Sequence, residues 1–128
     1  MSKKKNIPLI EAVIDNRLDE VRAMLANNVD VDQQDEIGYT ALHYAAQNYL
    51  VDIALFLLEH KASVDVKDSY GNTPLFRAVF NSKGRGEMIK LLLRFGADKN
   101  LKNNHGVSPI DLAGTIANYQ VAPFFSNA

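Results

Sequence analysis

The chain has 128 residues, of which 47% are hydrophobic and 23% are charged, as in an ordinary globular domain with one continuous core. Its formal net charge of −1 provides no overall positive field that would attract nucleic acid or anionic lipid. The absence of cysteine excludes disulfides, thiolate catalysis and cysteine-based zinc sites. It is compatible with a cytoplasmic location, which we expect, although exported proteins can also lack cysteine.

The N-terminal segment contains a run of lysines, Lys3 to Lys5, which resembles the start of a secretory signal. A proline and several charged residues interrupt the apolar stretch that follows, so it is too short for a signal. The longest uninterrupted apolar run, Ile53 to Leu58, is also far too short to span a membrane. We therefore expect a flexible tail at residues 1–5, a single domain at residues 6–128 and no membrane association.

A period of 33 residues runs along the chain. It separates Ala45 from Ala78 and Gly38 from Gly71, whereas Gly106 follows Gly71 after 35 residues. The additional residues fall in a glycine-rich polar stretch at 81–86, which we expect to be an insertion between two helices. Self-similarity at such a period is typical of repeat proteins, in which each unit packs on its neighbours. The predicted units are residues 6–35, 36–68, 69–103 and 104–128.

Each unit has the pattern of two short helices followed by an extended turn. In the second unit, Thr40 is a suitable N-cap for a helix from Ala41 to Asn48, and a second helix is expected from Val51 to Glu59. Helices below about 12 residues are marginal in water on their own. These helices are therefore predicted to be stable only when they stack on the next unit.

The segments between units carry the residues of tight turns. An Asp or Asn that can bond to nearby backbone is followed, three residues later, by a glycine that can adopt a positive φ. This pattern occurs at residues 35–38, 68–71 and 103–106. Pro74 and Pro109 then occupy the first helical position, where the missing N–H removes no hydrogen bond.

These patterns resemble the ankyrin repeat, which runs Gly-x-Thr-Pro-Leu-His-x-Ala-Ala, then a second helix with a Leu-Leu pair, then Gly-Ala-Asp-x-Asn. The first part corresponds to residues 38–46 and 71–78, and the second part to residues 92–100. The resemblance covers about residues 6–125. It implies an all-α, ankyrin-repeat solenoid of about four helix-turn-helix units linked by β-turn fingers.

The sequence departs from the ankyrin pattern in two respects. His43 stands where the family has a histidine that hydrogen-bonds nearby backbone, but the third unit has Phe76 there, so we expect packing to hold that turn. The glycine that ends the second helix is present as Gly96 but is replaced by Asn28 and Lys61 in the earlier units. Asn tolerates the left-handed conformation well, whereas Lys61 is expected to be mildly strained.

The C-terminal segment, residues 111–125, is similar to the closing cap of bacterial ankyrin proteins. Some of those proteins are encoded beside polymorphic toxins and act as immunity proteins. The resemblance therefore implies a small bacterial protein, and a cognate toxin or effector as one possible kind of partner.

Residues that could carry catalysis or bind a metal are not arranged for either role. His43, His60 and His105 fall at different positions of their units, and no pair of ligands has the spacing of a helical zinc motif. The acidic run from Asp30 to Glu36 lacks the glycine that an EF-hand loop needs at its sixth position. We therefore predict no enzyme activity, no catalytic residue, no metal and no cofactor.

The predicted functional site is a surface. In ankyrin proteins the turn tips and the exposed side of the first helices form a concave face that commonly binds a partner, and the resemblance implies the same here. Several of its positions carry large apolar or aromatic side chains, which are favoured at binding hot spots. The neighbouring carboxylates of Asp32, Asp35 and Glu36 favour a basic partner. The implied partner-binding residues are Glu36, Ile37, Tyr39, Tyr44, Gln47, Asn48, Ser69, Tyr70, Asn72, Arg77, Phe80, Asn81, Asn104, His105 and Val107.

The insertion adds a basic pair, Lys83 and Arg85, in a loop that we expect to project from the solenoid. It is either a tolerated surface insertion or a secondary contact for the partner, and it is too small for specific nucleic-acid recognition. Both ends of the chain are polar, which favours a capped monomer. We expect this monomer to inhibit one cognate protein, with a general scaffold or adaptor for a host or signalling protein as the alternative.

Overall fold

The computed structural model describes residues 7–115 and 120–125. In this part of the chain it contains helices and no strand, as an all-α solenoid requires. The predicted tail at residues 1–5, the end at 126–128 and part of the C-terminal motif, 116–119, lie outside the described residues. The elements are α1 (Pro8–Ile14), α2 (Leu18–Ala26), α3 (Ala41–Gln47), α4 (Val51–Glu59), α5 (Pro74–Phe80), α6 (Glu87–Arg94), α7 (Pro109–Thr115) and the 3-10 helix η1 (Ala122–Phe125).

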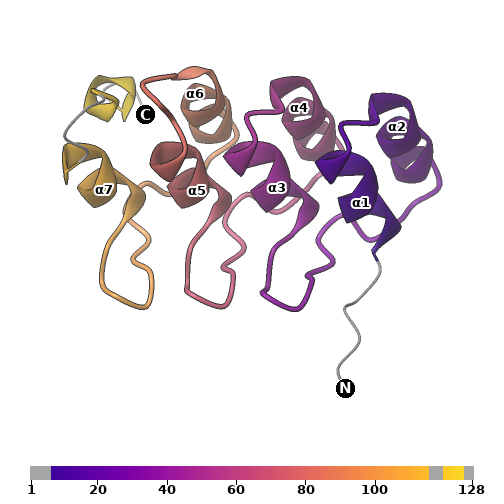
Figure 1. The fold of residues 1–128 in the computed structure, drawn as a ribbon, viewed down its shortest axis with the longest axis horizontal. Helices are drawn as coiled ribbons and strands as arrows, with labels where there is room; N and C mark the ends of the chain where they lie inside the picture. Colours follow the sequence, from indigo (N-terminus) through magenta and orange to yellow (C-terminus); the bar gives the residue numbers. More distant parts are fainter. Residues whose placement is uncertain (1–6, 116–119, 126–128) are drawn as a thin grey trace.

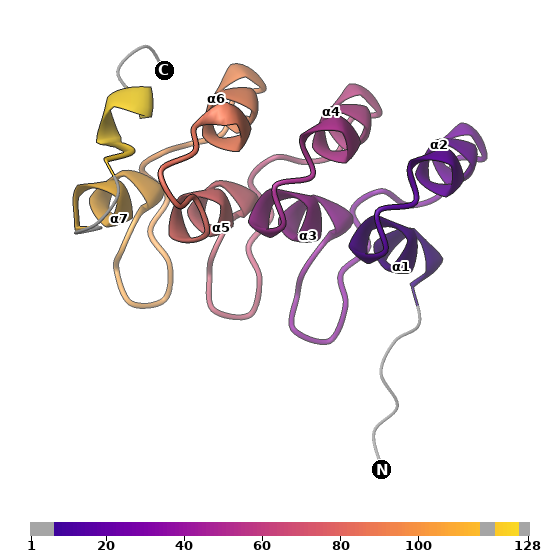
Figure 2. The ribbon, with the colours of Figure 1, turned by 45° about the horizontal axis from the view of Figure 1, so that its top comes forward.

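The helices form two rows that run the length of the molecule (Figure 1). The inner row consists of α1, α3, α5 and α7, and each of its helices packs on the next. The outer row consists of α2, α4 and α6, and η1 packs against α6 where a fourth outer helix would stand. Three loops, at residues 27–40, 60–73 and 95–108, lead from each outer helix to the next inner helix. They project from the inner row on one side as fingers (Figure 2).

The helices are short, and their ends are fixed by specific residues. Thr40 Oγ1 accepts a hydrogen bond from the His43 N–H at 3.3 Å, and Thr73 Oγ1 accepts one from the Phe76 N–H at the same distance. Pro74 and Pro109 are the first residues of α5 and α7, as predicted. The helix predicted at Val51–Glu59 is confirmed, and the one predicted at residues 41–48 ends one residue earlier because Asn48 is its C-cap.

The core is a continuous apolar layer between the two rows. Its fully buried leucines include Leu42 and Leu57 from the second helix pair and Leu75 and Leu92 from the third. Phe76 is also buried, so packing replaces the histidine of the ankyrin pattern in the third unit, as expected. No helix could bury such residues alone, and the stacking of pairs supplies the missing contacts.

The outer helices end in the left-handed conformation at equivalent positions. The φ angles are 59° at Asn28, 67° at Lys61 and 91° at Gly96. The strain expected at Lys61 is therefore present in the backbone, because a left-handed residue other than Gly or Asn costs about 1–2 kcal/mol. Gly96 occupies the position of Lys61 in the next repeat, so a glycine is compatible with the backbone at this position.

We expect Lys61→Gly to raise the free energy of unfolding by about 0.5–1 kcal/mol. The gain from relieving the positive φ exceeds the additional entropy that glycine gives the unfolded chain. Urea denaturation followed by circular dichroism would measure it. Lys61→Ala is the matched control, since it removes the same exposed side chain and keeps the strain. Equal stabilisation by both variants would contradict the backbone explanation.

Candidate protein-binding surface

The three fingers are built by the same backbone turn. Asp35 Oδ1 accepts hydrogen bonds from the N–H groups of Ile37 (3.1 Å) and Tyr39 (2.9 Å). Asp68, 33 residues after Asp35, and Asn103, 35 residues after Asp68, accept the corresponding pairs of bonds. The predicted turn chemistry is thus confirmed in every finger. Its consequence is that residues 37, 70 and 105 occupy the same place at three successive fingertips.

Backbone hydrogen bonds join the fingers to one another. The Ser69 N–H donates to the Ile37 carbonyl at 3.0 Å, and the Asn104 N–H donates to the Tyr70 carbonyl at 2.9 Å. Side chains add further links, including a bond from Asn104 Nδ2 to the Ser69 carbonyl at 3.0 Å. The fingertips are therefore held in one array, and their backbone needs little ordering when a partner binds.

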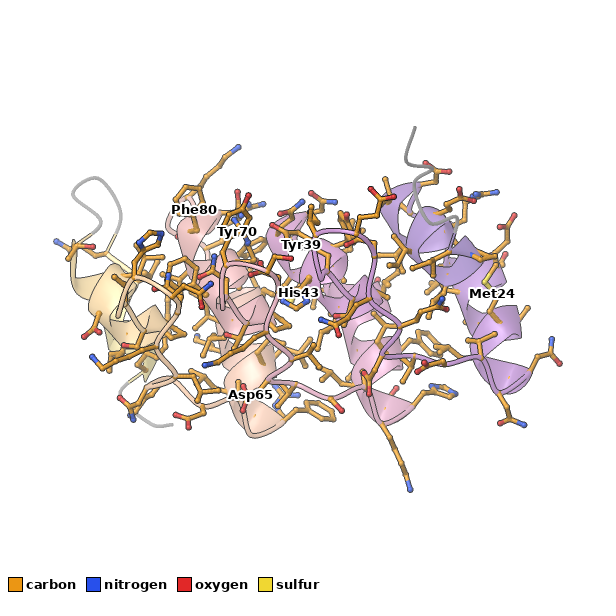
Figure 3. All side chains as sticks on the ribbon, turned by 90° about the horizontal axis from the view of Figure 1, so that it is seen from below. Met24, Tyr39, His43, Asp65, Tyr70 and Phe80 are labelled. Atoms are coloured by element: carbon orange, nitrogen blue, oxygen red, sulfur yellow. The ribbon has the colours of Figure 1, made fainter. Side chains whose placement is uncertain are left out.

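Large apolar side chains are exposed on this array and on the neighbouring helix ends. Tyr70 is 55% exposed and Ile37 is 44% exposed at the fingertips, and Phe80, the last residue of α5, is 62% exposed. Figure 3 shows Tyr70 and Phe80 toward one edge of the molecule and Asp65 toward the opposite edge. We call the surface formed by the fingertips and the last turns of the inner helices the inner face.

Two of the residues expected to face water are buried, which corrects that prediction. Tyr39 is 5% exposed and Asn72 is 7% exposed. Tyr39 immediately precedes the N-cap Thr40, a position whose apolar side chain packs on the fourth helical residue. The Asn72 side chain accepts a hydrogen bond from Asn103 Nδ2 at 2.9 Å. The Tyr39 ring lies 4.8 Å from the Tyr44 ring and stacks on His43 at 5.1 Å. Burial raises the pKa of the Tyr39 phenol, as it should for a ring in this position.

Tyr44 and Arg77, which share a repeat position, are only partly exposed because they bond to finger carboxylates. The Tyr44 hydroxyl donates to Asp35, and Arg77 Nη2 lies 3.5 Å from Asp68 Oδ2. Burial and the bond to Asp35 raise the pKa of the Tyr44 phenol. The Arg77 guanidinium also lies 5.1 Å from the centre of the Tyr39 ring. These side chains connect each inner helix to its finger and contribute only part of their surface to the inner face.

Two of the carboxylates expected to attract a basic partner are used within the fold. Asp35 accepts the finger bonds described above, and Asp32 accepts from the Ser63 N–H at 2.9 Å and from the Ser63 hydroxyl at 2.8 Å. Glu36, at the first fingertip, is exposed. Four of the remaining predicted residues are exposed: Asn48, Ser69, Asn104 and His105. The other three are half-buried: Gln47, Asn81 and Val107.

The basic insertion does not project freely, which corrects a second expectation. The Arg85 guanidinium lies 3.9 Å from the centre of the Tyr49 ring, and its Nε donates to the Ser82 carbonyl at 2.9 Å. The Tyr49 hydroxyl donates to the Ala78 carbonyl of α5 at 2.6 Å and lies 3.3 Å from the Arg85 carbonyl, so the loop is fixed to the preceding repeat. Gly86 packs against Phe124 so closely that a Cβ there would lie 2.7 Å from the ring. Of the pair, Lys83 is the side chain for which the structure shows no such anchoring contact.

The inner face includes one residue that the sequence interpretation missed. Ile14, the last residue of α1, is 47% exposed and lies 33 residues before Gln47 and 66 before Phe80. The 33-residue period could have predicted it, because counting back from Gln47 in the second unit leads to Ile14 in the first. Asp15 is likewise the repeat counterpart of Asn48 and Asn81. The inner face therefore extends over the first helix pair.

The described residues offer no sign of a metal site or a membrane span. No three His, Asp or Glu side chains among them lie close enough together to hold a metal ion. None of the helices in the described ranges is both long and apolar enough to cross a bilayer. The chemistry that the inner face does offer is apolar contact with polar groups around it, which suits binding to a protein surface.

Comparisons with known proteins point to the same family of folds. Residues 3–103 match the family described as Ankyrin repeats (3 copies). An ankyrin repeat protein of Fowlpox virus (strain NVSL) is 35% identical over 122 residues, covering 89% of this chain and 35% of the viral protein. The 26S proteasome non-ATPase regulatory subunit 10 of Dictyostelium discoideum is 40% identical over 96 residues, covering 73% of this chain and 40% of the subunit.

A bacterial relative is of similar closeness. An ankyrin repeat protein of Rickettsia felis is 35% identical over 99 residues, covering 75% of this chain and 32% of that protein. The chain therefore spans between about a third and two fifths of these three relatives. With the family match over most of its length and the stacked helix pairs of the structure, the chain belongs to the ankyrin-repeat family, whose repeats generally mediate protein–protein interaction.

Proposed function

We propose that this chain recognises one partner protein through its inner face and acts as a dedicated inhibitor, such as a bacterial toxin immunity protein. The observation that carries the proposal is the exposure of Ile37 and Tyr70 on a hydrogen-bonded array and of Phe80 at the neighbouring helix end. We further propose that the protein is a cytoplasmic monomer when free and that inhibition is steric, by covering the partner's active surface. Ankyrin repeats are typically binding modules without catalytic activity, and nothing in this proposal requires catalysis.

The exposed rings are suited to supply binding energy. Tyr70 and Phe80 are more than half exposed, so each has roughly 100 Å² to bury, equivalent to about 2–3 kcal/mol of transfer free energy. Only two χ angles per ring have to be ordered on binding, and the fingers are already connected. Polar residues such as Asn48, Ser69 and Asn104 surround the rings and form a suitable rim.

The alternative is a general scaffold or adaptor for a host or signalling protein. The relatives favour it, since this chain spans only part of each of them and one is named as a regulatory subunit of the 26S proteasome. The dedicated inhibitor is supported by the C-terminal resemblance. Both functions use the inner face, and they differ in the number and nature of the partners.

The test is capture of partners from the native host's lysate, followed by mass spectrometry. The informative bait carries Tyr70→Asp and Phe80→Asp, because both side chains are exposed and their loss should leave the fold intact. Tyr39 is unsuitable for this purpose because it is buried. The matched control is Phe95→Asp, which removes an exposed ring at the end of α6, outside the inner face. Circular dichroism would first establish that all baits fold.

We expect the wild-type chain and Phe95→Asp to capture the partner and the double variant to lose it, with an affinity lower by about 100-fold or more. One stoichiometric partner that is a toxic enzyme would support the inhibitor, and several weak partners would support the scaffold. Partners retained by the double variant would place the binding site elsewhere and refute the role of the inner face.

A further inference from the structure

The near-zero net charge of the chain conceals a strong separation of charge along the solenoid. Residues 7–68, which form the first two helix pairs, contain twelve acidic and four basic residues, a net charge of −8. Residues 69–125, which form the other two pairs, contain three acidic and seven basic residues, a net charge of +4. These halves occupy opposite ends of the molecule (Figure 1). A partner therefore meets an electric field that changes sign along the binding surface.

The inner face shares this polarity. At its acidic end, Glu36 is exposed at the first fingertip and Asp15 is exposed at the end of α1. Asp15 pairs with Arg17 at 3.1 Å, but this pair is open to water and contributes little, so a partner's cation can replace Arg17. Further along, the equivalent positions are neutral, Ser69 and Asn104 matching Glu36 and Asn81 matching Asp15. Arg77 is covered by the Tyr39 ring and bonded to Asp68.

The apolar side chains lie beside these acidic groups. Ile37 follows Glu36 at the first fingertip, and Ile14 precedes Asp15 at the end of α1. Tyr70 and Phe80 continue the apolar surface over the third helix pair. A complementary binding segment would have apolar side chains along its length and basic side chains toward one end. Such a segment favours one direction, since the reverse direction removes its cations from Asp15 and Glu36 and brings them to the half whose net charge is +4.

We propose that the inner face binds a polypeptide segment that combines apolar anchors with lysine or arginine residues at one end. Its apolar residues contact Tyr70 and Phe80, and its basic residues lie over Asp15 and Glu36. This inference rests on the proposed function and adds the chemistry and direction of the partner. A second copy of this chain is a different occupant, since its own basic half could also cover the acidic half.

The test uses a displayed library of random peptides about 16 residues long. That length crosses three inner helices packed about 8–10 Å apart, in either helical or extended form. The wild-type chain is the target, and Tyr70→Asp/Phe80→Asp identifies the peptides that bind at the inner face. We expect those peptides to combine apolar residues with Lys or Arg clustered toward one end.

Charge-reversal variants then measure the contribution of the acidic end with the selected peptides. Asp15→Lys/Glu36→Lys should lower the association rate about 10-fold at low salt, with a smaller change in the dissociation rate. The matched control, Asp52→Lys/Glu59→Lys, changes the net charge equally on exposed positions of the outer helix α4 and should lower the rate less than about threefold. The difference between the variants should disappear in about 1 M salt.

The outcomes separate this inference from the proposed function. Inner-face peptides without basic residues, or equal effects of the two charge reversals, would overturn the inference and leave the proposed function standing. Peptides that bind Tyr70→Asp/Phe80→Asp as well as the wild type would count against both. Sedimentation analysis completes the test: a dimer that dissociates on Tyr70→Asp would make a second copy the occupant and refute the proposal.

Discussion

Gly38→Ala is expected to lower the free energy of unfolding by about 3 kcal/mol or more. Gly38 has a φ of +82°, where an alanine costs about 1–2 kcal/mol. In addition, a Cβ at this position would lie 2.8 Å from the backbone nitrogen of Ser69 and 3.0 Å from the Cα of Asp68. Both atoms belong to the next finger and cannot move without disturbing the hydrogen bond from Ser69 to Ile37. Urea denaturation of the purified variant would measure the loss.

Gly106→Ala is the matched control for this prediction. Gly106 occupies the same turn position in the last finger, with a φ of +77°, but a Cβ there would meet no atom within 4 Å. Its substitution should therefore show only the backbone strain, about 1–2 kcal/mol. The difference between the two variants measures how much the close approach of neighbouring fingers requires glycine. Equal losses would show that φ alone explains both glycines and that the finger contact is easily adjusted.

The period was sufficient to predict the fold, because each ankyrin unit repeats both its helices and its turns. The start of α5 at Pro74, the bounds of α4 and the turns at Asp35 and Asp68 all follow from residues within one unit. Counting also placed the two-residue insertion between Ala78 and Leu93, and the glycine-rich stretch at 81–86 narrowed its position. Local signals specify these features, and stacking reinforces them.

The exposure of individual side chains was harder to predict, because it depends on the neighbouring repeat. Tyr39 is buried by packing on His43 and Tyr44 and by the Arg77 guanidinium, which belongs to the next unit. Arg85 is held by Tyr49, 36 residues away in the preceding unit. The position within a single repeat assigns both side chains to the surface, because it leaves out the contacts made by the neighbouring repeat. The position before the N-cap was nevertheless a usable signal for Tyr39.

The charge separation was also present in the sequence, but the total net charge concealed it. Counting the charges of residues 7–68 and 69–125 separately gives −8 against +4, and Lys3 to Lys5 add the +3 that brings the total to −1. The structure adds which carboxylates remain open to a partner. Asp32 and Asp35 are bonded within the fold, whereas Glu36 is exposed at a fingertip. Turn carboxylates that cap backbone N–H groups are therefore poor candidates for recognition, even when a sequence places them next to the binding surface.

His43 makes the stability of the protein depend on pH. Its Nε2 lies 2.9 Å from the Asn72 carbonyl, which requires a proton on Nε2, and its Nδ1 accepts from the Thr40 N–H at 3.1 Å. The ring is fully buried, and this burial lowers the pKa of His43 below its ordinary value of 6.5. A second proton on Nδ1 would face the Thr40 N–H, so the folded state favours the neutral ring.

We expect the wild-type chain to lose up to about 1 kcal/mol of stability between about pH 7.5 and pH 5.5. Because the folded pKa is depressed, the unfolded chain binds a proton below pH 6.5 that the folded chain binds only at lower pH. The protein is therefore fully stable above this window and loses stability as the pH falls through it. Burial also raises the pKa of Asp65, but its ordinary value of 3.8 lies well below this pH window.

The variant His43→Phe separates the titration from the packing. Phe76 shows that a buried phenylalanine fits the equivalent position of the next repeat. At pH 7.5 we expect the free energy of unfolding of the variant to be about 2 kcal/mol lower than that of the wild type, because the buried Thr40 N–H loses its acceptor. Its stability should then stay nearly constant down to pH 5.5, whereas replacing the exposed His60 and His105 by glutamine should preserve the wild-type slope. Urea titrations at several pH values measure both quantities, and a slope retained in His43→Phe would assign the pH dependence to other groups.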